Sequence, residues 1–131
     1  MFADRLDAEA RGKFLELVYK LASCDGRYGE EEKEIVDNYR NELSVQEISD
    51  TGSIYELADY FSEKENPVKK IVLFEVCGII LSDHNVGEKE QEAFDYMKKV
   101  LALDGQVTEE IISVANDLKI IRDRIADIIF S

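Results

Sequence analysis

The sequence predicts an all-α protein: a single-domain compact bundle of about seven helices, with two pseudo-repeated helix-loop-helix units around a buried central helix. Three observations support this prediction. Apolar residues recur at spacings of three and four, capping residues precede several of these segments, and strand signals are weak throughout. The chain has 131 residues, of which 45% are hydrophobic, so it can form one core without disulfides or metals. We therefore expect residues 1–131 to form one domain.

Four helices are expected in the first half of the chain. The first carries an apolar stripe and ends near Cys24, and the second runs from about Glu30 to Leu43. Ser44-Val-Gln-Glu47 and Ser53-Ile-Tyr-Glu56 each match a capping box, which predicts two shorter helices. The stripe of the first helix consists of Leu6, Ala10, Phe14, Leu17, Val18 and Leu21.

Three helices are expected in the second half. Asn66 followed by Pro67 is typical of a helix start, and this helix runs to about Ser82. Because its residues are apolar on nearly every side, we expect it to be the buried centre of the fold. Another helix covers residues 87–103, and Thr108 opens the last one. The stripe of the last helix consists of Ile112, Ala115, Leu118, Ile121, Ile125 and Ile128.

The composition limits the kinds of partner. The 29 acidic and 16 basic residues give a net charge of −13, which argues against nucleic acid, because phosphate binding requires a basic surface. Cys24 and Cys77 stand in apolar helical segments without a metal-binding pattern, so we interpret them as buried free thiols in a reducing compartment. The first residues lack the apolar core of a signal peptide, and the longest apolar stretch, 71–81, is too short to span a bilayer. We expect a cytoplasmic protein without direct membrane insertion.

An acidic motif occurs twice, at an offset of 58 residues. The copies are Asp25-Gly-Arg-Tyr-Gly29-Glu-Glu-Glu32-Lys-Glu34 and Asp83-His-Asn-Val-Gly87-Glu-Lys-Glu90-Gln-Glu92. In each copy an apolar segment runs into the Asp, and a Glu stands seven residues later. If the two copies face each other, their carboxylates form a site for a divalent cation or a cationic partner. Calcium, magnesium and manganese prefer such oxygen ligands, although the spacing does not fit an EF-hand.

Helix capping is an alternative explanation of this motif. Asp25-Gly26 can end one helix, Gly29 can cap the next, and Glu32 can reach back to the amide of Gly29. A third turn, Asp104-Gly-Gln-Val-Thr108, keeps the turn and the cap but has Ile111 at the position of the Glu. The turn therefore does not itself require this carboxylate, and both interpretations stay open.

The two turns resemble those of the family of the tellurite-resistance protein TerB, whose relatives include a cytosolic domain of the DnaJ-like membrane protein DjlA. The resemblance covers most of the chain. It rests on Leu21-Ala-Ser-Cys-Asp25-Gly26 followed by Glu32, and on Ile79-Ile-Leu-Ser-Asp83 followed by Glu90, with His84 in place of the second glycine. It implies an all-helical fold of about seven helices, an acidic surface and a divalent-cation site. By position, the implied metal ligands are Asp25, Glu32, Asp83 and Glu90.

We expect no enzymatic activity, because no side chain has the sequence neighbours of an activated nucleophile and no glycine-rich phosphate loop is present. His84, the only histidine, is interpreted as a solvated turn residue. The leading hypothesis is a non-enzymatic acidic domain that binds a divalent cation in a stress or tellurite and metal-resistance response. The alternative is an acidic protein–protein interaction module that binds a basic or membrane-associated protein and holds no metal.

Overall fold

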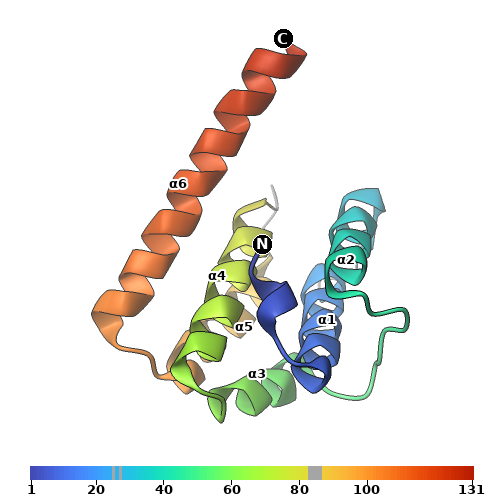
Figure 1. Cartoon of the computed structure of the whole chain (residues 1–131), viewed down its shortest axis with the longest axis vertical. Helices are drawn as coiled ribbons and strands as arrows, with labels where there is room; N and C mark the ends of the chain where they lie inside the picture. Colours follow the sequence, from blue (N-terminus) through green and yellow to red (C-terminus); the bar gives the residue numbers. More distant parts are fainter. Residues whose placement is uncertain (25, 27, 83–86) are drawn as a thin grey trace.

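A computed structural model describes residues 1–24, 26, 28–82 and 87–131. These residues form a short 3-10 turn and six α-helices, and none of them lies in a strand, which confirms the all-α class (Figure 1). The elements are η1 (Ala3–Arg5), α1 (Ala8–Ser23), α2 (Glu30–Leu43), α3 (Ile54–Ser62), α4 (Asn66–Ser82), α5 (Glu88–Leu101) and α6 (Gly105–Phe130).

Helix α4 lies at the centre of the packing and contacts η1, α1, α3, α5 and α6. This position agrees with its composition, because Val72, Leu73, Val76 and Cys77 are all buried. Burial raises the pKa of the Cys77 thiol to about 12, and nearby Lys98 offsets only part of this effect. Cys77 is therefore a protonated core side chain at neutral pH.

The structure has one helix fewer in the first half than the sequence predicts. Ser44 does not begin a helix, because it takes a left-handed conformation at φ 56° and ends α2 instead. The amide of Val45 donates to the carbonyl of Arg40 at 3.1 Å, which closes this helix end. The prediction from Ser44 was wrong, whereas the matching one from Ser53 is confirmed, since its hydroxyl accepts from the amide of Glu56 at 3.1 Å.

The last helix begins three residues earlier than predicted. Asp104 caps it by accepting a hydrogen bond from the amide of Gln106, so Thr108 lies within the first turn rather than at the start. The first half of α6 packs against α4, where Ala115 is buried. The second half projects from the bundle (Figure 1). In this half Ile121, Ile125 and Ile128 of the apolar stripe are exposed.

Glu16 holds the extended segment between α2 and α3. It lies on the inner face of α1, with 1% of its surface exposed. Its Oε2 accepts hydrogen bonds from the amides of Thr51 at 3.1 Å and Gly52 at 2.7 Å. The buried carboxylate and the two backbone amides thus satisfy one another's hydrogen-bonding needs. In a helical segment these amides would donate to carbonyls of the same helix instead.

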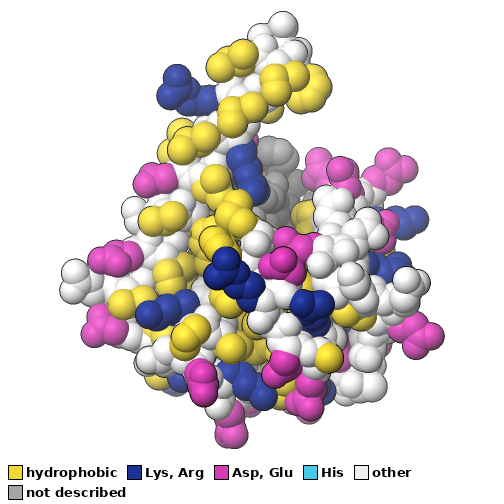
Figure 2. Space-filling view, viewed as in Figure 1, with side chains coloured by type: hydrophobic (Ala, Val, Ile, Leu, Met, Phe, Trp, Pro, Cys, Tyr) yellow, Lys and Arg dark blue, Asp and Glu magenta, His cyan; other side chains and the backbone are white. Residues whose placement is uncertain are grey.

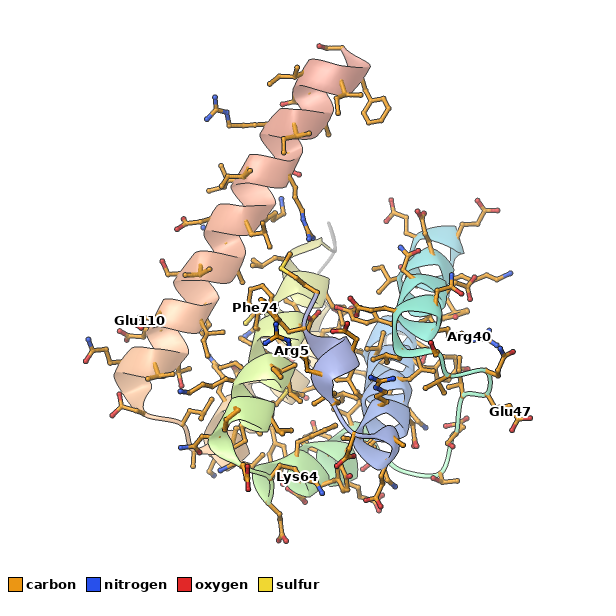
Figure 3. The ribbon with its side chains drawn as sticks, viewed as in Figure 1. Arg5, Arg40, Glu47, Lys64, Phe74 and Glu110 are labelled. Atoms are coloured by element: carbon orange, nitrogen blue, oxygen red, sulfur yellow. The ribbon has the colours of Figure 1, made fainter. Side chains whose placement is uncertain are left out.

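Glu75 forms a second buried polar cluster, on α4. Its carboxylate accepts from the amide of Phe2 at 2.8 Å and from the hydroxyl of Tyr39 at 2.6 Å, and it pairs with the amino group of Met1 at 3.0 Å. The Phe2 ring packs edge-on against Phe74, which Figure 3 labels beside Arg5 where η1 crosses α4. Burial by itself raises the pKa of Glu75, but these three donors together outweigh it and lower the pKa below 4.5.

Replacement of Glu16 by Ala is expected to destabilise the fold, because the amides of Thr51 and Gly52 lose their acceptor. We expect a loss of about 2–3 kcal/mol in the free energy of unfolding, measured by urea denaturation. Glu47→Ala, in the same segment but exposed, serves as the control and should change stability by less than about 0.5 kcal/mol. Equal effects of the two substitutions would contradict the anchoring role of Glu16.

The Glu75 cluster predicts a pH-dependent contribution to stability. Because the pKa of Glu75 is lower in the folded than in the unfolded state, its ionised form stabilises the fold above about pH 4.5. This contribution is lost as the pH falls through the folded-state pKa. We expect Glu75→Gln to lower the free energy of unfolding by about 1–3 kcal/mol near neutral pH, as measured by urea titration. The gap in stability between this variant and the wild type should narrow below about pH 4.5. A gap that stays constant down to about pH 3 would exclude this linkage.

Candidate metal site

Four helices enclose a cavity of about 240 Å³ at the ends where the two acidic motifs begin. Helices α1 and α4 contribute apolar walls, and the first turns of α2 and α5 contribute carboxylates. The cavity is lined by Leu21, Ala22, Glu31, Glu32, Glu34, Ile35, Asn38, Ile79 and Glu90. Two of the four predicted ligands, Glu32 and Glu90, therefore reach the same cavity although 58 residues separate them in the sequence.

Glu90 is buried, with 3% of its surface exposed. Its position on α5 explains this burial, because residues three, four and seven positions later share its helix face. These residues, Ala93, Phe94 and Met97, are all buried in the core. Glu90 thus occupies a core position of an amphipathic helix, and α5 directs a carboxylate toward the interior.

Glu32 lies on the corresponding face of α2, one turn before buried Val36. Its Oε2 accepts a hydrogen bond from the amide of Gly29 at 3.1 Å, so it does act as the predicted helix cap. Capping uses one of its two carboxylate oxygens. Because Glu32 also lines the cavity, capping and ligand binding are compatible roles for this side chain.

Three further polar residues of α2 line the cavity, and sequence reasoning did not assign them to a site. Glu31 and Glu34 belong to the first acidic motif, and Asn38 follows Glu34 by one helical turn. Their spacing contains the missing signal, because Glu31, Glu34 and Asn38 are three and four residues apart and so follow one edge of the helix. Together with Glu32 and Glu90 they give this cavity carboxylate and amide oxygens, the donors that hard cations prefer.

The other two predicted ligands, Asp25 and Asp83, lie outside the described residues, as does His84. Among the residues that are described, no three His, Cys, Asp or Glu side chains converge on a common metal position. The two predicted ligands that are described, Glu32 and Glu90, offer carboxylate oxygens, which suit a hard cation. Both side chains line the same cavity.

Comparison of the chain with family models, with curated proteins and with solved structures gives no match. Within the part of the chain that the structure describes, none of the helices combines the length and apolar character needed to cross a bilayer.

Proposed function

We propose that this protein is a non-enzymatic, cytoplasmic, TerB-like helical domain that binds a divalent cation in a stress or tellurite and metal-resistance response. The proposed ligands are Asp25, Glu32, Asp83 and Glu90. The observation that carries the proposal is the meeting of Glu32 and Glu90 in one cavity, from two copies of the same motif. Calcium, magnesium and manganese are the candidate ions, because all four side chains offer oxygen atoms.

The position of the aspartates in the chain supports this assignment. Asp25 follows α1 closely and Asp83 directly follows α4, and these are the two helices whose last turns supply Leu21 and Ile79 to the cavity wall. Each motif therefore offers one carboxylate after the first helix of its pair and another at the start of the second. A pair of such units can supply four ligands from facing helices, as helix-bundle metal sites do.

The carboxylates around the cavity that Glu90 lines give the proposal an electrostatic basis. Like charges that lie close together repel each other. Glu31, Glu32 and Glu34 line the same cavity, so a fully ionised cavity concentrates negative charge. A divalent cation would neutralise part of this charge, and its binding would then stabilise the folded state.

Calorimetric titration of calcium, magnesium and manganese into the chelated protein at matched ionic strength tests the proposal. We expect about one or two ions to bind saturably and the double variant Asp25→Asn, Asp83→Asn to bind none. An ion at about 100 times its dissociation constant should raise the free energy of unfolding by about 2.7 kcal/mol. Matched ionic strength is needed because a chain of charge −13 is stabilised by general screening as well.

Three further variants separate the metal site from helix capping. Glu90→Gln should weaken binding, whereas Glu92→Gln on the exposed side of α5 should not. Glu32→Gln keeps an oxygen that can accept from Gly29 but removes the charge, so it should preserve most of the stability and lose affinity. A flat titration of the wild-type protein would refute the metal site and leave capping as the role of Glu32.

The surface of α2 favours a second candidate function, an acidic module that binds a basic or membrane-associated protein. Glu30, Glu31 and Glu34 are exposed on its first turns, and acidic side chains gather over this end of the helix at the upper right of Figure 2. Capture of such a partner should weaken steeply as salt rises and persist in EDTA. The combined charge reversal Glu30→Lys, Glu34→Lys should abolish it. Capture that EDTA abolishes would instead assign the interaction to the metal-bound form.

A further inference from the structure

The projecting part of α6 carries an apolar seam with the spacing of a coiled coil. Its positions alternate by three and four residues over almost three heptads, which keeps them on one side of the helix. Ile111 and Leu118 are half-buried, and the other four positions are 50–76% exposed. The seam consists of Ile111, Val114, Leu118, Ile121, Ile125 and Ile128.

Most of the seam lies beside the face by which α6 packs on its own bundle. Ala115 is buried against the bundle, and Arg122 lines a hollow of about 360 Å³ between α2, α4 and α6. Each of these residues directly follows a seam position, so the contact with the bundle lies along one flank of the seam. Two seam residues also take part in it, because Ile111 packs against the core and Leu118 lines the hollow. The bundle leaves the other four seam positions at least half exposed, and Figure 2 shows apolar side chains running along α6 to the body of the molecule.

The opposite flank of the seam carries Glu110, Asp117 and Arg124, each one residue before a seam position. All three are exposed, and Figure 3 shows Glu110 on the side of α6 that faces away from α4. No ion pair within the described residues involves Asp117 or Arg124. In an antiparallel pair of identical helices these flanking positions face each other, and Asp117 of one copy then meets Arg124 of the other.

We infer that α6 is a homodimerisation helix whose seam packs antiparallel against the α6 seam of a second copy of this chain. In this arrangement Ile111 lies opposite Ile128, Val114 opposite Ile125 and Leu118 opposite Ile121, and every layer occurs twice through the twofold axis. The Asp117–Arg124 pair also occurs twice and fixes the register. A second copy fits this surface because the chain itself supplies both the apolar layers and the complementary charges.

The antiparallel direction follows from the charges as well. A parallel pair would place Asp117 opposite Arg122 of the other copy. Arg122, however, lines the hollow beside Tyr39 and Glu75 of its own chain, where it lowers the pKa of Tyr39 against the larger raising effects of burial and Glu75. Arg124 is exposed and available for the partner. Pairing through Arg124 therefore leaves the contacts of Arg122 with its own bundle intact.

Sedimentation equilibrium of the full chain tests the dimer. Ile121→Glu removes a seam layer, whereas Ile120→Glu changes the neighbouring residue, which lies off the seam; both isoleucines are 51% exposed. Because two copies of the seam position are lost per dimer, we expect Ile121→Glu to weaken dimerisation by about 100-fold or more and Ile120→Glu by less than about threefold. Circular dichroism should show both variants folded, since neither residue is in the core.

The direction is tested by charge reversal and by crosslinking. Asp117→Arg alone should weaken the dimer, and addition of Arg124→Asp should restore it. In a background with Cys24 and Cys77 replaced by Ala, a mixture of Asp117→Cys and Arg124→Cys chains should form the mixed disulfide. Ile128→Cys alone, which can pair with itself only in a parallel dimer, should not crosslink.

A wild-type chain that remains monomeric at about 500 µM would overturn the inference, because a stable interface has a dissociation constant far below that concentration. Equal effects of Ile120→Glu and Ile121→Glu would also overturn it, because they would show that the seam does not form the interface. A monomer that binds phospholipid vesicles through Ile121 would overturn it in favour of a membrane-surface helix.

Discussion

The burial of α4 is the constraint on which the rest of the structure depends. A helix with apolar residues on nearly every side is stable in water only if other elements cover it on all sides. Five elements do so, and each fully buried Val, Leu or Ile contributes about 1.5–3 kcal/mol of transfer free energy. The one acidic residue of α4, Glu75, is acceptable in this position because Phe2 and Tyr39 donate hydrogen bonds to it. The position of η1 and the inner face of α2 are therefore both tied to the composition of α4.

Helix starts could be predicted from the sequence where local capping residues alone determine the structure, and not where a distant residue intervenes. Asn66 followed by Pro67 predicted the start of α4, which begins at Asn66. Ser44 and Ser53 carry the same local signal, a Ser followed by a Glu three residues later, yet only Ser53 begins a helix. The segment after Ser44 is held by Glu16 of α1, whose carboxylate accepts hydrogen bonds from the amides of Thr51 and Gly52. A contact between residues 35 positions apart cannot be predicted from a capping pattern.

The candidate site shows the same division between local and long-range information. The motif spacing identified Glu32 and Glu90, and the apolar residues Ala93, Phe94 and Met97 could have predicted that Glu90 is buried. That both carboxylates line one cavity depends on how α2 and α5 pack around α1 and α4, which no local pattern contains. Asn38 could not be assigned to the site for the same reason, because its side chain lines a cavity that forms only when the neighbouring helices pack together.

The distribution of charge connects the acidic bundle with its projecting helix. Residues 119–131 carry three basic and two acidic side chains, so the negative charge of the protein resides in the bundle. Two such bundles repel each other unless they are kept apart. A helix of 26 residues is about 39 Å long, and an antiparallel pair places the two bundles beside opposite halves of the paired helices rather than face to face. The length of α6 beyond the bundle thus allows apolar pairing between chains whose acidic surfaces would oppose a closer approach.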